Sequence, residues 1–198
     1  AAAAATLHCG VTLTEVAEGI HALRAVPGRM ERIENTAPFE VFVDYAHTPD
    51  ALQRCLQFLQ RLTPGRVICV FGAGGDRDRT KRPLMGHAVS SNTNVALLTS
   101  DNPRSEQPDQ IIQEIHTGIP SDTACQILIE PDRELAIQKA LELARPGDAV
   151  LIAGKGHETE QIIGHQRLHF DDREVARRLL NPPVSPSRPP HAWNRNRF

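Results

Sequence analysis

Short apolar runs alternate with longer amphipathic stretches along most of the chain. The apolar runs are rich in Val, Ile and Leu and are bounded by Gly, Pro, Asn or Asp, a pattern typical of buried strands. They cover residues 39–44, 66–72, 94–99, 125–130 and 148–154. The stretches between them place apolar residues three and four positions apart, which predicts helices. These helices cover residues 49–62, 82–91, 107–119 and 131–144, and a hairpin over 161–170 and a helix over 171–180 follow. The alternation predicts a Rossmann-like α/β fold, a doubly wound, mostly parallel sheet with a C-terminal hairpin and helix.

Unusual polar residues follow four of the predicted strands, always on the same side. They occupy residues 44–47, 72–78, 101–104 and 154–158, whereas the turns at the opposite strand ends are plain. Because sheets of this kind bind ligands beyond the carboxyl ends of their strands, we expect a site at this edge.

Composition narrows the class of protein. The chain has 198 residues, a formal net charge of −2 and 40% hydrophobic residues, which is ordinary globular usage. A charge so close to neutral gives no electrostatic reason to expect binding to nucleic acid or to an anionic membrane. No apolar stretch is long enough for a membrane span, and the four cysteines are scattered without CxxC spacing. We expect a cytoplasmic monomer that binds neither nucleic acid nor membrane.

The two ends of the sequence differ from the middle. Residue 1 is Ala, and residues 1–10 lack the features of a signal peptide, so we expect them to be the end of a helix in a longer protein. Residues 181–198 are rich in proline and too polar to form a core, which predicts a disordered tail.

Each polar cluster has a structural and a functional interpretation. The segment 72–78 follows neither the Walker pattern nor GxGxxG, since Arg77 stands where the third glycine would fall. It is either a flexible turn or a loop whose arginine binds a carboxylate or a phosphate. The segment 101–104 is either a helix-capping turn or a receptor for a ligand. Positive charge is disfavoured near a helix N-terminus, so Arg104 there favours an anionic partner.

Five segments, in this order, resemble the C-terminal domain of the Mur ligases. They are "PGRMERI" (27–33), "VDYAHTPDAL" (43–52), "FGAGGDRDRTKRPLMG" (71–86), "TSDNPR" (99–104) and "IAGKGHE" (152–158). Within that family they are most similar to the members that add meso-diaminopimelate to UDP-N-acetylmuramoyl-L-alanyl-D-glutamate during peptidoglycan synthesis. The resemblance implies an ATP-dependent amide-bond ligase with meso-diaminopimelate, the UDP-N-acetylmuramoyl-dipeptide and ATP as partners. It also implies that ATP and Mg²⁺ are bound mainly by a central domain that this sequence does not include.

The resemblance also implies roles for individual residues and segments. The diaminopimelate contacts would be Arg77, Asp101, Asn102, Pro103, Arg104, Gly154 and Glu158, and the ATP-facing residues would be Arg29, Asp44 and His47. No metal ligand and no certain catalytic residue falls in this chain. Residues 1–26 would be the end of a central-domain helix and a hinge, residues 27–180 the C-terminal domain, and residues 181–198 the tail.

Other functions stay open on the sequence alone. The chain could be a non-catalytic binding module derived from such a ligase, a lysine-adding relative or a folate polyglutamate synthetase. Lysine-adding relatives generally lack an arginine at the end of "DNPR", and a dehydrogenase is disfavoured by the missing third glycine.

We predict that purified residues 1–198 form no tripeptide product from ATP, meso-diaminopimelate and the nucleotide substrate. Without a phosphate loop the chain cannot place the γ-phosphate or the Mg²⁺ that neutralises developing charge. Weak binding of meso-diaminopimelate is still expected. A product assay by chromatography tests this, and turnover by the purified chain would contradict it.

Overall fold

The computed structural model describes residues 2–23 and 25–181, so the predicted tail lies almost entirely outside the described residues. The helices are α1 (Ala2–His8), α2 (Leu13–Ala22), α3 (Pro49–Leu62), α4 (Lys81–Ser90), α5 (Pro108–His116), α6 (Arg133–Leu143) and α7 (Asp172–Leu180). The strands are β1 (Glu31–Arg32), β2 (Glu40–Asp44), β3 (Val67–Phe71), β4 (Val95–Leu98), β5 (Gln126–Ile129), β6 (Ala149–Ala153), β7 (Glu160–Ile163) and β8 (Gln166–His169).

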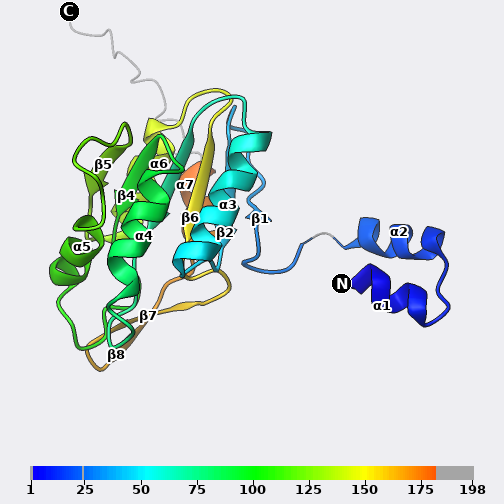
Figure 1. Cartoon of the computed structure of the whole chain (residues 1–198), viewed down its shortest axis with the longest axis horizontal. Helices are drawn as coiled ribbons and strands as arrows, with labels where there is room; N and C mark the ends of the chain where they lie inside the picture. The colour runs from blue at the N-terminus through cyan, green and yellow to red at the C-terminus, as the bar shows by residue number, and fades with distance from the viewer. Residues whose placement is uncertain (1, 24, 182–198) are drawn as a thin grey trace, which may run out of the picture.

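One six-stranded sheet organises the body, in the order β1-β2-β6-β3-β4-β5. The five longer strands run parallel, and the short β1 pairs antiparallel with β2. The predicted doubly wound, mostly parallel sheet is therefore confirmed, and β7 and β8 form the predicted antiparallel hairpin. Figure 1 shows this hairpin beneath the sheet. The last parallel strand of the chain, β6, lies between β2 and β3, which the periodicity alone did not indicate.

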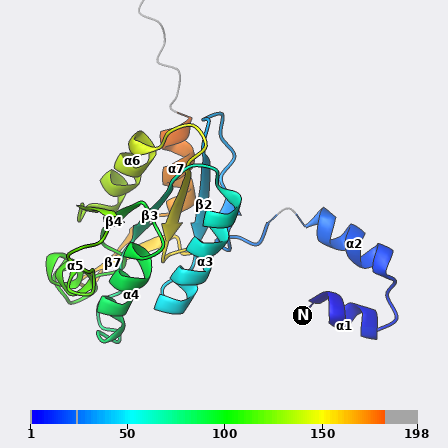
Figure 2. The same cartoon turned by 45° about the horizontal axis from the view of Figure 1, so that its top comes forward.

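Helices cover both faces of the sheet (Figures 1 and 2). Leu52, Leu56 and Leu59 of α3 pack on one face together with apolar residues of α4 and α5. The opposite face carries α6 and α7. Every residue of β3 and β6 is buried, which explains why these strands are continuous apolar runs and not alternating ones. Thr48 accepts a hydrogen bond from the backbone N–H of Ala51 and caps α3.

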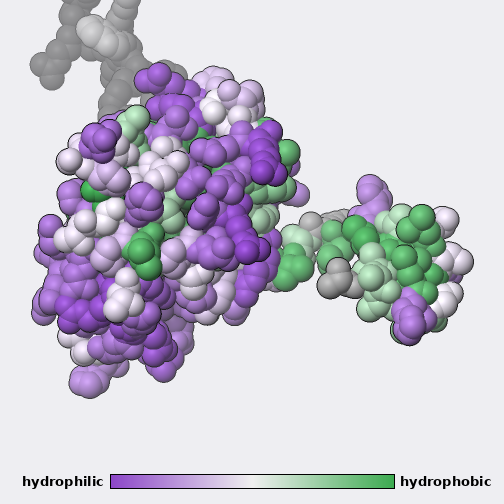
Figure 3. Space-filling model, in the orientation of Figure 1, coloured by the Kyte–Doolittle hydropathy of each residue, from purple (hydrophilic) through white to green (hydrophobic). Residues whose placement is uncertain are grey.

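The first two helices contact each other, and Figures 1 and 2 both draw them away from the body. Thr12 and Glu15 form a capping box at the start of α2. Val16 is the only buried residue of the two helices, and Leu13 and Ile20 are exposed. Figure 3 shows the resulting hydrophobic surface. No helix in the described part of the chain is long and apolar enough to cross a membrane.

A fully buried ion pair joins α6 to α7. Arg133 donates to both carboxylate oxygens of Asp172 at 2.8 Å, and both side chains are inaccessible to solvent. The same guanidinium donates to the carbonyl oxygens of Ser100 at 3.2 Å and Ala153 at 3.0 Å. Since these carbonyls lie where β4 and β6 end, Arg133 fixes two loops that follow the sheet.

Replacing Arg133 with Met should destabilise the protein by about 3–5 kcal/mol, because it leaves the carboxylate of Asp172 buried and unpaired. Arg178→Met is the matched control. Arg178 pairs with Glu134 across the same two helices, but both side chains are largely exposed, so its loss should cost no more than about 1 kcal/mol. Urea unfolding of the three proteins measures the difference, and equal losses would contradict this account.

Candidate functional site

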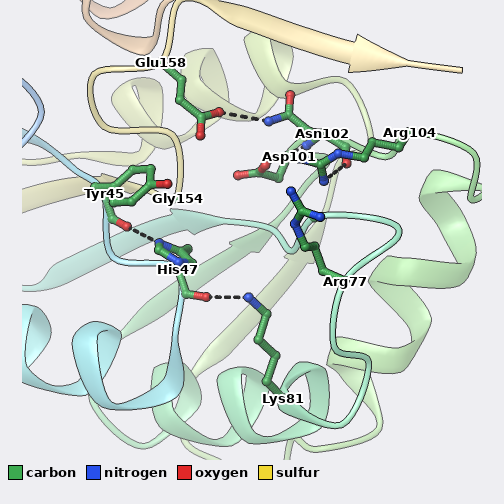
Figure 4. A pocket seen from close by; sticks show the side chains of 10 residues that line it. Tyr45, His47, Arg77, Lys81, Asp101, Asn102, Arg104, Gly154 and Glu158 are labelled. Atoms are coloured by element: carbon green, nitrogen blue, oxygen red, sulfur yellow. Dashed lines mark hydrogen bonds between the residues drawn. The ribbon is translucent and has the colours of Figure 1, made fainter. Parts of the chain in front are cut away.

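A cavity of about 170 Å³ lies at the carboxyl edge of four adjacent strands, β2, β6, β3 and β4 (Figure 4). Its walls carry three cationic side chains and two carboxylates. The lining residues are Tyr45, His47, Gly74, Arg77, Lys81, Asp101, Asn102, Arg104, Gly154 and Glu158. Groups of both charges around one small space suit a ligand that itself carries both charges.

Both the oxygen and the nitrogen of the Asn102 carboxamide form hydrogen bonds. Its Oδ1 accepts from Lys155 Nζ at 3.2 Å and from the backbone N–H of Ile162 at 3.0 Å. Its Nδ2 donates to Glu158 Oε2 at 2.9 Å. Two donors on the oxygen leave only one orientation of the amide, with the NH₂ group toward the carboxylate.

Arg104 is held by backbone carbonyls. Its Nη1 donates to the carbonyl oxygens of Gly75 at 2.8 Å and Asn102 at 3.4 Å. The following helix begins only at Pro108, so the sequence argument that Arg104 needs an anion because it sits at a helix N-terminus is wrong. Nε and Nη2 make no hydrogen bond to any described residue, and Arg104 lines the cavity.

The loops after β3 and β4 interlock. The backbone N–H of Gly75 donates to the carbonyl of Asn102 at 2.9 Å. A Cβ atom at position 75 would lie 1.8 Å from the carbonyl oxygen of Pro103, so only glycine fits this approach. Arg82, fully buried, donates to the carbonyl of Gly74 at 3.2 Å and to both carboxylate oxygens of Glu106 at 2.8 Å. These bonds to Arg82 lower the pKa of Glu106 to about 2.

Two more residues complete the cavity wall. Gly154 has a φ of +117°, and a Cβ atom there would lie 2.7 Å from Asp101 Oδ2. Lys81 is half-buried, and its Nζ donates to the carbonyl of His47 at 3.0 Å. Burial lowers the pKa of Lys81, while the charge of Asp101 opposes that change.

The residues proposed for diaminopimelate gather here, except one. Arg77, Asp101, Asn102, Arg104, Gly154 and Glu158 line the cavity, and Pro103 does not. The buried Pro103 instead places its carbonyl against Gly75. That these residues contact diaminopimelate stays a prediction.

The residues proposed to face ATP are placed differently. His47 lines the cavity, but Asp44 and Arg29 do not. Asp44 is buried and accepts hydrogen bonds from the backbone N–H groups of Met30 and Ala46, both at 2.7 Å. The guanidinium of Arg29 lies 4.5 Å from the centre of the Tyr45 ring, so Tyr45 connects it to the cavity wall.

Sequence reasoning assigned no role to Tyr45, Gly74 and Lys81, although they line the cavity. All three fall inside the quoted motifs. A motif marks a loop, but it does not tell which side chains of the loop point inward, and that is why these residues were missed.

A magnesium site is not formed by the residues that the structure describes. No group of three His, Cys, Asp or Glu side chains among them is arranged so that it could hold a metal ion. The donor set of this cavity, with three cations, does not fit Mg²⁺ either. No reaction step is therefore assigned to a metal held by these residues.

Comparison with known proteins gives a consistent result. Residues 28–156 match the family model described as "Mur ligase, glutamate ligase domain". The chain is 52% identical over 182 residues to the UDP-N-acetylmuramoyl-L-alanyl-D-glutamate--2,6-diaminopimelate ligase of Nostoc sp. (strain PCC 7120), covering 91% of this chain and 36% of that protein. It is 54% identical over 155 residues to the enzyme of the same name from Lawsonia intracellularis, covering 78% of this chain and 32% of that protein. The chain thus spans about a third of the length of these curated relatives.

Solved structures agree. A structure of UDP-N-acetylmuramoyl-L-alanyl-D-glutamate--2,6-diaminopimelate ligase matches with a TM-score of 0.73 and 42% identity, over 91% of this chain and 37% of that one. E. coli FolC in complex with ADP matches with a TM-score of 0.55 and 22% identity, over 74% of this chain and 33% of that one. At that identity the second match concerns the fold alone.

Gly75→Ala should destabilise the protein by roughly 1–3 kcal/mol, because the added methyl group forces the two interlocked loops apart. Gly19→Ala is the control: a Cβ atom there meets nothing within 4 Å, and alanine is the better helix former, so no loss is expected. Urea unfolding compares both variants with the parent. An unchanged free energy of unfolding for Gly75→Ala would show that the approach to Pro103 is not tight.

Proposed function

Because the chain belongs to the Mur ligase family, in its glutamate ligase domain, we propose that it is the amino-acid-binding part of an ATP-dependent ligase. The proposed reaction joins meso-diaminopimelate to UDP-N-acetylmuramoyl-L-alanyl-D-glutamate in the cytoplasm, as a step of peptidoglycan synthesis. ATP phosphorylates the D-glutamate side-chain carboxylate, the amine of diaminopimelate attacks the acyl phosphate, and phosphate leaves as the amide forms. Parts of the protein beyond this chain would hold the ATP phosphates and Mg²⁺.

The observation that carries the proposal is the arrangement of opposite charges in one cavity. Arg104 keeps Nε and Nη2 available, and Arg77 makes only a long 3.4 Å bond to the carbonyl of Asp76. Two such guanidinium groups can bind a carboxylate in a bidentate manner. Asp101 and Glu158 on the same wall can accept from an ammonium group. The carboxylate and the ammonium group at one end of diaminopimelate would pair with these guanidinium groups and carboxylates, while the amine at the other end reacts.

The same arrangement supports selectivity against lysine. Lysine has no carboxylate at its distal end, so its binding would leave Arg104 and Arg77 without the anion that the site accommodates. When the wrong ligand leaves the polar groups of a site unpaired, the site can favour the right ligand by about 10⁴-fold. In this proposal Arg104 is the main determinant of which amino acid is added.

Titration calorimetry with the 198-residue chain tests this directly. We expect meso-diaminopimelate to bind about 10-fold to 100-fold more tightly than L-lysine, since a charged hydrogen-bonded pair contributes about 1.5–3 kcal/mol. Arg104→Met should remove most of that preference by weakening diaminopimelate binding alone. Arg167→Met is the control, because Arg167 is exposed, pairs with Glu160 and does not line this cavity.

Two results would count against the proposal. One is equal affinity of the parent chain for the two amino acids. The other is an Arg104→Met variant that keeps the parent's preference while its unfolding is unchanged.

A further inference from the structure

The backbone of Arg104 adopts a conformation that needs outside support. Its φ is +52°, in the left-handed region, where a residue with a side chain is disfavoured. Such a conformation persists only where the surrounding structure holds it, and it often lies at a functional position.

Both backbone polar groups of Arg104 bond to the β7–β8 hairpin. The N–H of Arg104 donates to the carbonyl of Ile162 at 3.0 Å, and the N–H of Gly164 donates to the carbonyl of Arg104 at 2.7 Å. The hairpin thus pairs with Arg104 as a strand would pair with its neighbour.

The hairpin also holds Asp101 and Asn102, which lie before Pro103 in the same segment. Gln161 Nε2 donates to the carbonyl of Asp101 at 2.9 Å, and the N–H of Ile162 donates to Asn102 Oδ1 at 3.0 Å. Asp101, Asn102 and Arg104 are therefore each bonded to β7 or to the turn that follows it.

Lys155 ties the base of the hairpin to the same segment. Its side chain is fully buried, and its Nζ contacts Asn102 Oδ1, the carbonyl of Glu160 and, at 3.6 Å, the carboxylate of Glu158. Lys155 does not line the cavity, and neither does any residue of the hairpin. Their hydrogen bonds reach the residues that do.

The hairpin contributes little to the core. All four residues of β8 are exposed, and neither β7 nor β8 belongs to the six-stranded sheet. Hydrogen bonds to Asp101, Asn102 and Arg104, and not burial of the β8 side chains, therefore connect the hairpin to the body, which favours a positioning role.

We propose that the β7–β8 hairpin, through Gln161, Ile162 and Gly164, is the positioning element that holds Asn102 and Arg104 toward the cavity. It thereby sets the preference for an amino acid with a second carboxylate. This inference rests on the proposed function, because it assigns that preference to the residues the hairpin holds. Gln161 acts through the backbone of Asp101 and is a positioning residue, not a ligand-binding one.

Gln161→Leu tests the proposal, because it removes the donor to Asp101 and keeps nearly the same size. Gln166→Leu makes the same change on β8, where the side chain is exposed and bonds to no described residue. By titration under conditions where both variants are folded, Gln161→Leu should weaken meso-diaminopimelate binding about fivefold to tenfold and change L-lysine binding less. Gln166→Leu should match the parent. Equal affinities for the two variants would overturn the proposal.

Amide hydrogen exchange in the ligand-free chain provides a second measurement that needs no ligand. The N–H groups of Arg104 and Gly164 should exchange severalfold faster in Gln161→Leu than in the parent and in Gln166→Leu. Unchanged exchange would overturn the positioning role even if the affinities changed. If the parent chain binds neither amino acid, the proposed function fails, and the exchange rates alone decide whether the hairpin holds Arg104.

Discussion

The carboxamide of Asn102 is the point on which the carboxyl edge of the sheet depends. It joins the loop after β4 to the loop between β6 and β7 and to β7 itself, since its oxygen accepts from Lys155 and from the backbone of Ile162 and its nitrogen donates to Glu158. Each of these partners carries a charge or a backbone dipole that would be costly to bury unpaired. One neutral side chain with two acceptor and two donor positions satisfies all of them and keeps their spacing fixed.

Two buried arginines, one from each helical layer, hold further loops at the carboxyl edge of the sheet. Arg82 on α4 reaches the carbonyl of Gly74 after β3, and Arg133 on α6 reaches the carbonyls of Ser100 and Ala153 after β4 and β6. Each guanidinium is paired with carboxylates on a neighbouring helix or loop. The loops around the cavity are thus braced from both faces of the sheet, which leaves the cavity's own charged groups to meet a ligand.

The sequence predicted the parts of this molecule that depend on local patterns. Buried parallel strands are continuous apolar runs, and α3 has apolar residues three and four positions apart, so both were found. Strand order was not predicted, because the place of β6 between β2 and β3 depends on pairing between segments far apart in the chain. Arg82 and Arg133 also escaped notice, since an arginine near a helix start is usually solvated and only its partners reveal that it is buried. The motifs indicated the right loops, but they did not separate Asp44, whose carboxylate binds backbone, from Asp101, which lines the cavity.

The central place of β6 has a consequence for how the chain matures. During synthesis, β2 and β3 are complete once Phe71 has been added, whereas β6 begins only at Ala149. Until then the nascent polypeptide carries two apolar strands whose facing edges lack their partner, the kind of edge that invites pairing with another chain. In the finished fold β6 pairs with both of these edges, and the loop that follows it carries Lys155 to Asn102. The sheet and the cavity therefore both require this one late strand, and the two edges stay unpaired for as long as it is missing.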